Sequence, residues 1–512
     1  QMEKHPHAKE FKEAVEKEIA KLESMETGEE VPGGRHGVPH GAKILRSIFT
    51  FVTKRMADTG EVEKYKARCV ADGSKQTDPE DTHAPTIGAT TLRTLLAVSV
   101  AAGHVRSTAD VESAFLIEKI DKDTYVQLPV DYTNDKGVAP RVWKLLKSLY
   151  GLKQAPRLFW LGMRDTLIKA GFKSSDHDPC LFIRQEKDGS HAYVGTHVDD
   201  LIISSTTAKT NREIRDHLLT KYQGITWNDT AKTFVGLALG EREDGSLLVS
   251  QPAYTDHIIQ ALHIKADGKT SNPNFHRTER VGEIKEELIP WLRLAVGLVQ
   301  YVTFTRMELH LALNQVAREM HKPTRETEAA MNQILNYLGN RPRDGLLYTR
   351  SGEIKLTCWV DASWQSEKGN VSRTGYAMNL GTDSAVVMAY SKAQIYATLS
   401  SQHSEIVALT EAVRSVLHLR MLLEDMGYTQ AEPTEIHEDN AACIAFANST
   451  APLEKTKHIA NRDRFVREAA NTKQVKVTKI HTKKQPVDGL TKAVGGDEFK
   501  RMRLFLQRGR EA

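Results

Sequence analysis

The amino-acid sequence predicts an α+β domain, a mostly helical region and a C-terminal α/β domain, in that order. Short strand-like and helical segments alternate from about residue 43 to 239, which is typical of an α+β domain. Four stretches between residues 251 and 345 have the apolar spacing of helices, and a cleanly alternating stretch at 354–364 opens a region of strands and long helices. At 512 residues the chain exceeds the size at which a single core keeps growing, so we expect more than one domain.

Composition indicates an ordinary globular protein from a reducing compartment. Apolar residues make up 40% and charged residues 27% of the chain, and a formal charge of +4 does not by itself indicate a nucleic-acid binder. The four cysteines are scattered without a C-x-x-C pair, which argues against a zinc module and a disulfide framework. No apolar run is long enough to span a bilayer. We therefore expect a cytosolic or nuclear protein, and the start at Gln1 suits a fragment cut from a longer precursor.

The N-terminal domain is predicted from its apolar periodicity. In the first thirty residues, Phe11, Val15, Ile19 and Leu22 recur at helical spacing between charges, which indicates an amphipathic surface helix. The pattern also predicts a strand at 47–56 and a helix at 91–103. Two antiparallel strands are predicted at 191–198 and 201–205, with a turn at 198–201 between them.

The C-terminal domain is predicted from one central strand and one long helix. Leu356, Cys358 and Val360 alternate onto one face of the strand, so Asp361 falls on the other face, where we expect it to end or interrupt the strand. The remaining predicted elements are strands at 374–380, 385–391, 434–440 and 475–482 and helices at 402–426 and 459–471.

Two adjacent aspartates stand in apolar sequence in "YVGTHVDDLIISS", where like charges in a half-buried segment are costly. Asp199 and Asp200 either form an ordinary acidic turn, since Asp favours turns, or bind a cation. Taken alone, the predicted hairpin favours an ordinary acidic turn over a cation-binding site. Asp110, at the end of another strand-like stretch, changes this balance, because two-metal phosphoryl transfer needs carboxylates from different elements.

The C-terminal domain has an acidic set of its own. Each member has an ordinary interpretation as a strand end, a cap or a first-turn acid that stabilises a helix dipole. Four carboxylates on four elements can also converge on two divalent cations. The set consists of Asp361, Glu405, Asp439 and Asp488.

Five motifs occur in one order over some 140 residues: "EKYKARCVADG", "DVESAFL", "KLLKSLYGLKQAPRLFW", "DHDPCLFI" and "HVDDLIIS". Together they resemble the reverse transcriptase of copia-type LTR retrotransposons. The resemblance continues through "FVGLALGEREDGSLLVSQPAY" and "RLAVGLVQYVTFTR". In the C-terminal domain, "SRTGYAM" and "KHIANRDRFVRE" resemble the ribonuclease H of the same elements.

This resemblance implies a fold and a division into domains. The expected fold is an α+β right-hand polymerase with fingers, palm and thumb, followed by an α/β ribonuclease H-like domain with a mixed sheet. Fingers and palm are expected at 1–250, a helical thumb or connecting region at 251–345 and the ribonuclease H domain at 350–512. Each of the two active sites is expected to bind two Mg²⁺ ions, with Mn²⁺ as a substitute.

The resemblance also implies the role of single residues. In the palm, Asp110 and Asp199 match the metal-binding carboxylates and Asp200 matches the third. Phe115 matches the aromatic residue that disfavours a 2′-hydroxyl, and Gln154 matches the position beside the nucleotide and template base. Lys66 and Arg68 resemble the cations that bind the triphosphate, although spacing alone favours a solvated strand face. In the nuclease, the four acids of the C-terminal set match the metal ligands, with Asp488 in a variable segment.

The sequence departs from the family at two places. His197 stands where the family usually has tyrosine or phenylalanine, near the primer end, and the segment 71–86 lacks the common basic and aromatic pattern. All seven matched carboxylates are present, which favours activity.

The expected function is therefore an RNA- and DNA-directed DNA polymerase with ribonuclease H activity that makes cDNA from element RNA. Expected partners are an RNA template, a DNA primer/template, an RNA/DNA hybrid, a tRNA-like primer, deoxynucleoside triphosphates and integrase from the same precursor, with no membrane. A monomer and a homodimer both stay open. The expected location is the cytoplasm, in a virus-like particle, with the nucleus as a later location of the cDNA complex. The alternative is a host-adopted or degenerate protein that binds RNA or hybrid with one or both activities lost.

Overall fold

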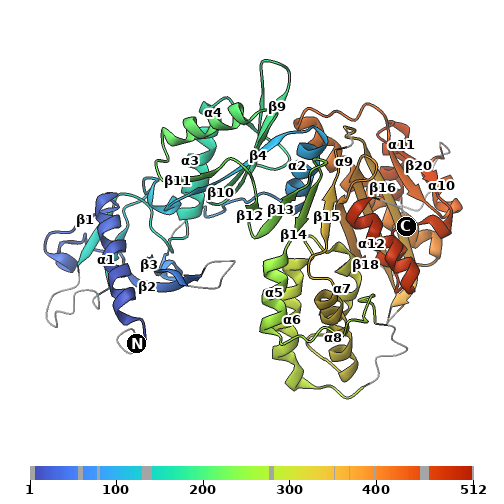
Figure 1. Ribbon diagram of the computed structural model, residues 1–512, viewed down its shortest axis with the longest axis horizontal. Coiled ribbons are helices and arrows are strands. Elements are labelled where there is room, and N and C mark those ends of the chain that lie inside the picture. Colours follow the sequence, from blue (N-terminus) through green and yellow to red (C-terminus); the bar gives the residue numbers. More distant parts are fainter. Residues whose placement is uncertain are drawn as a thin grey trace.

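The computed structural model shows three parts that follow one another along the chain (Figure 1). It describes residues 6–55, 62–77, 81–129, 141–275, 282–350, 352–367, 370–395, 398–449 and 460–509. An N-terminal arm lies at one end, a second sheet with its helices lies in the middle, and the C-terminal domain lies at the other end beside a group of helices.

The N-terminal arm is a five-stranded sheet with one helix packed on it. Helix α1 (Ala8–Ser24) buries the four apolar residues that the periodicity predicted, so this prediction is confirmed. The strands, in spatial order, are β1 (Gly28–Glu30), β6 (Val142–Leu145), β5 (Tyr125–Gln127), β2 (Ile44–Arg55) and β3 (Val62–Ala71).

The middle sheet is six-stranded and is covered by helices on both faces. Leu201 and Ile203 pack into the core formed with α3 and α4, whereas Ile202 points to the opposite face and packs against Leu95 of α2. Gly195 allows α2 this close, because a Cβ atom there would lie 3.2 Å from the Leu95 side chain. The strands, in spatial order, are β11 (Ile225–Asn228), β4 (Val105–Val111), β10 (Asp200–Ser205), β9 (His191–His197), β8 (Leu181–Gln185) and β7 (Lys173–Ser174). The helices are α2 (Ala89–Ala101), α3 (Ala155–Lys169) and α4 (Ala208–Leu219).

A buried histidine beneath this sheet makes the stability of the fold dependent on pH. His104 is 5% exposed, and its Nδ1 lies 3.1 Å from Ser204 Oγ. Burial, together with Arg106 and His191, lowers the pKa of His104 to about 4. The unfolded chain therefore takes up a proton at His104 at higher pH than the folded chain does, so stability is lost as pH falls from about 6.5 towards 4.

The variant His104→Asn should flatten this part of the pH profile. Asparagine can retain the bond to Ser204 but does not titrate. The free energy of unfolding of the wild type should fall between pH 6.5 and 4 by an amount on the order of 3 kcal/mol more than that of the variant. Urea unfolding across this range measures the difference. His36→Asn, on an exposed loop, is the control, and a variant profile as steep as the wild-type profile would contradict the assignment.

A four-stranded sheet and four helices connect the middle sheet to the C-terminal domain. Three of its strands precede the helices and one follows them, so both ends of the helical segment meet at this sheet. The strands are β12 (Thr233–Phe234), β13 (Leu237–Glu241), β14 (Leu247–Ser250) and β15 (Gly345–Tyr348). The helices are α5 (Pro252–Ala261), α6 (Ile289–Val302), α7 (His310–Ala317) and α8 (Arg325–Asn340), at the positions that periodicity predicted.

The C-terminal domain is a mixed five-stranded sheet in the order β18-β17-β16-β19-β20. The first three strands are antiparallel neighbours, whereas β19 pairs parallel with both β16 and β20. The strands are β16 (Leu356–Glu367), β17 (Val371–Leu380), β18 (Val386–Ala393), β19 (Thr434–Glu438) and β20 (Val475–Lys479). The helices are α9 (Ser401–Asp425), α10 (Ala441–Ala447), α11 (Ala460–Asn471) and α12 (Gly496–Arg508).

Two details of this domain differ from the expectation. Strand β16 does not end at Asp361: it pairs with β17 beyond that residue, and only its pairing with β19 stops, at Trp359. The sequence pattern also did not predict α12, which packs Phe505 on the sheet and Phe499 against Tyr337 of α8. The rings of Trp359 and Phe505 lie 4.7 Å apart, edge to face.

The middle sheet and the C-terminal domain contact each other directly. Tyr193 of β9 donates a hydrogen bond from its hydroxyl to the Met426 carbonyl (2.7 Å), and Ser175 Oγ donates one to Asp425 Oδ2 (2.5 Å). Arg93 of α2 donates to the Val387 carbonyl of β18 (2.7 Å). One continuous apolar core includes residues of α2, the connecting sheet and α9, so the two parts are packed together.

The expected fold class is confirmed, as an α+β right-hand polymerase followed by an α/β ribonuclease H-like domain with a mixed sheet. The division at residues 250 and 350 stays a prediction. In the described part of the chain, no helix combines the length and the apolar character needed to cross a membrane.

Candidate active sites

The three predicted carboxylates of the middle sheet lie at one end of two neighbouring strands. Asp200 is the first residue of β10 and lies directly opposite Asp110 of β4, so the two side chains share a face of the sheet. Asp199 precedes Asp200 in the turn from β9, and its carbonyl accepts the Val111 N–H (3.0 Å). The structure thus brings together Asp110, Asp199 and Asp200.

Mutual repulsion is evident in the electrostatics of this trio. Burial, together with the Asp199 and Asp110 carboxylates, raises the pKa of Asp200 to about 6. Like charges that face each other on adjacent strands destabilise a sheet. A bound cation would remove this cost, so the donor set suits a divalent metal.

The turn that carries Asp199 is shorter than predicted and is strained. Val198 and Asp199 alone form it, and Val198 has a φ of +57°, which β-branched residues rarely adopt. Strain of this kind costs on the order of 1–3 kcal/mol and persists where surrounding structure enforces it. His197, opposite Asp200 in the β9–β10 register, is half-buried, and burial lowers its pKa although Asp199 acts in the other direction.

The Tyr150 ring connects two of the predicted nucleotide residues, Phe115 and Arg68. Phe115, in the turn after β4, meets the Tyr150 ring edge to face at 5.8 Å, and the Arg68 guanidinium lies 5.7 Å from the centre of the same ring. Burial raises the pKa of Tyr150, with Asp199 among its charged neighbours. Arg68, Tyr150 and Phe115 therefore form one wall beside the acidic trio.

Lys66 and Arg68 lie on the same face of β3, as their spacing predicted. Both side chains are half-buried. Burial raises the pKa of the nearby Glu18 carboxyl, and the positive charges of Lys66 and Arg68 act in the opposite direction and lower it. The Arg68 Nε is buried and has no hydrogen-bond partner. This edge of the N-terminal sheet is therefore cationic.

Gln154 is buried at the start of α3, and the structure gives it a partner that the sequence did not indicate. The Gln76 side-chain amide donates to Gln154 Oε1 (2.9 Å), and Gln76 Oε1 accepts the Lys153 N–H (2.9 Å). Gln76 lies in the segment that departs from the family pattern, so this segment is connected to the Gln154 turn.

In the C-terminal domain, Asp361, Glu405 and Asp439 converge. Each offers a carboxylate oxygen, and the three oxygens lie within 4.8 Å of one another. Asp361 comes from the central strand β16 and Glu405 from the second turn of α9, and Asp439 directly follows β19. Because β16 and β19 stop pairing at Trp359, the sheet opens where these side chains meet.

Asp488 lies at the edge of this trio rather than within it. It belongs to a 3-10 turn, Asp488–Leu490, and it raises the pKa of Asp361, an effect second to burial. Lys492 Nζ lies 3.1 Å from Asp488 Oδ2, and the Thr491 hydroxyl donates to Asp361 Oδ2. Burial opposes the charge on Lys492, but Asp361 and Asp488 outweigh it and raise the pKa of the ammonium group.

The donor set of this second site also fits divalent cations. Burial raises the pKa of Glu405, and the carboxylates of Glu438, Asp361 and Asp439 raise it further. Three buried carboxylate oxygens at this site have no hydrogen-bond partner: Glu405 Oε2, Glu438 Oε2 and Asp488 Oδ1. Buried carboxylate oxygens normally have partners, so these oxygens fit metal ligands and their neighbours.

Besides Gln76, four residues of these sites were not found by sequence reasoning. Thr491 and Lys492 follow Asp488 at the spacing of one helical turn, which was a usable signal. Glu438 alternates with Thr434 and Ile436 onto the buried face of β19, and a glutamate in that pattern was also a signal. Tyr150 had no signal, because its position depends on contacts between distant segments.

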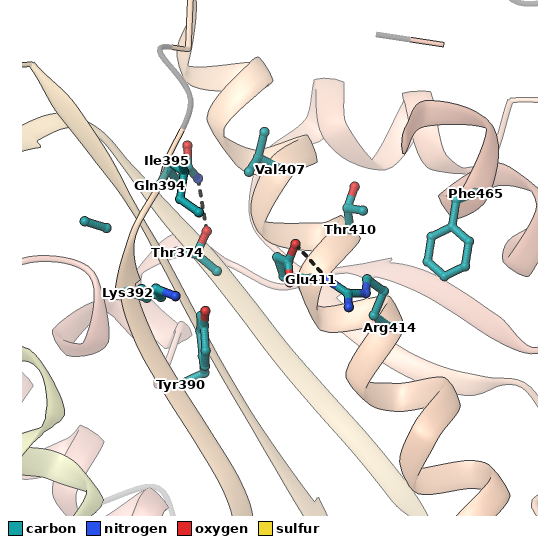
Figure 2. Close-up of a pocket in the computed structure, with 11 residues that line it drawn as sticks. Thr374, Tyr390, Lys392, Gln394, Ile395, Val407, Thr410, Glu411, Arg414 and Phe465 are labelled. Carbon is teal, nitrogen blue, oxygen red and sulfur yellow. Dashed lines mark hydrogen bonds and ion pairs between the residues drawn. The ribbon is translucent and has the colours of Figure 1, made fainter. Parts of the chain in front are cut away.

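A separate cavity of about 710 Å³ lies between β18 and α9 (Figure 2). On the α9 side of the cavity, Glu411 and Arg414 form an ion pair (3.1 Å). On the sheet side, Gln394 donates to Thr374 Oγ1 (3.1 Å). None of the predicted site residues lines this cavity.

Comparison with known proteins agrees with this geometry. Residues 37–274 match the family described as "Reverse transcriptase (RNA-dependent DNA polymerase)", and the palm trio lies inside that range. This part of the chain is therefore a reverse transcriptase domain.

The relatives define the class further. The chain is 28% identical over 458 residues to the retrovirus-related Pol polyprotein from transposon RE1 of Arabidopsis thaliana, covering 87% of this chain and 30% of the relative. It is 26% identical to that from transposon TNT 1-94 of Nicotiana tabacum, covering 97% and 37%, and 21% identical to the Ty1-MR1 Gag-Pol polyprotein of Saccharomyces cerevisiae, covering 95% and 28%. Over most of its length the chain is thus similar to Pol polyproteins of copia-type LTR retrotransposons, which confirms the resemblance, and it spans about a third of the length of these relatives.

Among solved structures, the foamy viral protease-reverse transcriptase in complex with double-stranded DNA is 12% identical, with a TM-score of 0.49, covering 92% of this chain and 70% of that one. The same viral protein in complex with an RNA/DNA hybrid gives a TM-score of 0.45 at 12% identity, covering 93% and 63%.

Proposed function

We propose that this chain is an RNA- and DNA-directed DNA polymerase with ribonuclease H activity, which copies retrotransposon RNA into cDNA. The observation that carries the proposal is the meeting of Asp110, Asp199 and Asp200 at one strand end inside a reverse transcriptase domain. The convergence of Asp361, Glu405 and Asp439 in a separate domain supports the second activity.

In the polymerase site, Asp110 and Asp199 would hold Mg²⁺, with Asp200 beside them and Mn²⁺ as a substitute. The metal supplies neutralisation of phosphate charge and a lower pKa for the attacking oxygen. The chain's own contribution is to fix the carboxylates: paired strands hold Asp110 and Asp200, and the strained Val198 turn holds Asp199.

The nucleotide would lie against the wall formed by Arg68, Tyr150 and Phe115. Lys66 and Arg68 are suited to bind the triphosphate, and the buried, unpartnered Arg68 Nε is free to donate to a phosphate oxygen. Gln154, held by Gln76, would contact the nucleotide or template base. Phe115 would close the space beside the sugar and so favour deoxynucleotides.

The variant Phe115→Val should relax this selection against ribonucleotides. A smaller side chain leaves room for a 2′-hydroxyl, and the ratio of ribonucleotide to deoxynucleotide incorporation should rise roughly ten- to a hundredfold. Single-nucleotide extension with matched ribo- and deoxynucleoside triphosphates measures the ratio. Phe51→Leu, on the partly exposed face of β2, is the control, and an unchanged ratio in Phe115→Val would refute this role.

In the nuclease site, Asp361, Glu405, Asp439 and Asp488 would hold the divalent cations for cleavage of the RNA strand of a hybrid. Thr491 and Lys492 would orient Asp361 and Asp488. The tRNA-like primer, integrase as a partner, the choice between monomer and homodimer, and a location in cytoplasmic virus-like particles or with nuclear cDNA stay predictions.

A direct experiment tests both activities on the full chain. Purified protein is incubated with Mg²⁺ and a DNA primer on an RNA template, and separately with a hybrid whose RNA strand is labelled. We expect primer extension and RNA cleavage, both abolished by a chelator. Binding of the hybrid without either reaction would favour the host-adopted alternative.

A further inference from the structure

Glu438 is a buried acid directly before the predicted metal ligand Asp439, and nothing in the family resemblance assigned it a role. It is 0% exposed and lies at the end of β19. Its Oε1 accepts the Asn440 N–H (2.9 Å), whereas its Oε2 has no hydrogen-bond partner. The backbone thus fixes the Oε1 atom of this carboxylate, whereas the Oε2 atom is buried without a hydrogen bond.

The surroundings of Glu438 are anionic. Among the charged neighbours of Glu405, Glu438 raises the pKa of Glu405 most. Asp361 and Asp439 in turn raise the pKa of Glu438. Glu405 is 6% exposed, and its own Oε2 also has no partner. The neighbouring Cys443 thiol, a weak donor, is within reach of the Glu438 carboxylate. Burial raises the pKa of this thiol most, followed by the charges of Glu438 and Glu405 and by the contact with Glu438.

Two buried acids with unpartnered oxygens are costly side by side. The single cation described beside the cluster, Lys492, lies against Asp488 at its other edge. Glu438 is not among the three residues whose oxygens lie within 4.8 Å of one another, so it is a charged neighbour of Glu405 rather than a member of the trio.

We infer that Glu438 is a positioning residue which, through Glu405, strengthens divalent cation binding at the Asp361–Glu405–Asp439 trio and makes the C-terminal domain depend on that cation for stability. The inference rests on the proposed nuclease site. Groups that support metal ligands from behind typically change metal affinity by about 10- to 100-fold.

The test measures Mn²⁺ binding to the full chain, followed by electron paramagnetic resonance, and thermal unfolding with and without Mn²⁺. All proteins carry Asp110→Asn and Asp199→Asn, so that the palm trio does not contribute. Onto this background come Glu438→Gln, Glu438→Asp, the matched control Glu435→Gln from the same strand, and Asp361→Asn to identify the site.

We expect Glu438→Gln to weaken Mn²⁺ binding by about 10- to 100-fold and to reduce the rise of the unfolding temperature on adding Mn²⁺, without lowering the unfolding temperature of the metal-free protein. Glu438→Asp should restore much of the affinity, and Glu435→Gln should leave it unchanged.

Three results would overturn the inference. Equal Mn²⁺ affinity in Glu438→Gln and its background overturns it alone. An unfolding temperature that Glu438→Gln lowers equally with and without Mn²⁺ also overturns it, because Glu438 would then stabilise the fold through packing alone. If the background protein has no Mn²⁺ site that Asp361→Asn removes, the proposed nuclease site fails as well.

Discussion

Replacing Asp199 with asparagine should reduce RNA-templated primer extension by on the order of a thousandfold or more. The two side chains have nearly the same size, so the Val198–Asp199 turn and the β9–β10 pairing should persist. What is lost is one negative charge in a trio that would hold cations against the triphosphate. The cations would neutralise the charge of the triphosphate and activate the attacking oxygen. Weaker cation binding should therefore lower the rate of extension and leave the affinity for the primer/template duplex unchanged.

Single-turnover extension under Mg²⁺ measures this loss, and filter binding of the primer/template measures duplex affinity. Asp188→Asn is the matched control, because Asp188 lies in the exposed turn at the other end of β9, where it accepts the Ser190 N–H. The control should extend at the wild-type rate. If Asp199→Asn extends as fast as Asp188→Asn, the polymerase assignment is wrong.

Replacing Asp439 with asparagine should abolish cleavage of the RNA strand of a hybrid, with a loss on the order of a thousandfold or more. Asp439 supplies one of the three oxygens that lie within 4.8 Å of one another, at the opening between β16 and β19. An amide keeps one oxygen but no charge, so it cannot hold a divalent cation at comparable strength.

A labelled RNA strand annealed to DNA reports the cleavage. Asp383→Asn is the control, since Asp383 lies in the exposed turn after β17 and has a φ of +57° that asparagine tolerates. Asp439→Asn should still extend primers, and Asp199→Asn should still cut RNA. Equal cutting by Asp439→Asn and wild type would rule out the nuclease site.

Elements with strong periodicity were predictable from the sequence. Helix α1, the long helix α9 and the β9–β10 hairpin were expected close to where they occur, because their apolar residues repeat at 3.6 or 2 positions. Helix α12 was missed. It is held by contacts from elsewhere, such as Arg503 with Asp344 (3.1 Å), and these leave little trace in its own sequence.

The candidate sites were predictable as sets of residues but not as geometry. Motif order indicated Asp110 and Asp199, yet only strand pairing brings Asp110 opposite Asp200. We expected Asp361 to end or interrupt β16. This was wrong for the pairing with β17, which continues past Asp361, whereas the pairing with β19 stops at Trp359. Tyr150 and Gln76 depend on tertiary contacts, which alternation within one segment does not encode.

The contacts of Tyr193 and Ser175 with the end of α9 have a consequence for how the two reactions relate in time. They join the sheet that carries the palm trio to the helix that carries Glu405. If both sites act on one duplex, the protein fixes the distance between them along that duplex. RNA would then be cut a constant number of base pairs behind the growing end. Template removal would then lag synthesis by a length that the protein sets and the copied sequence does not.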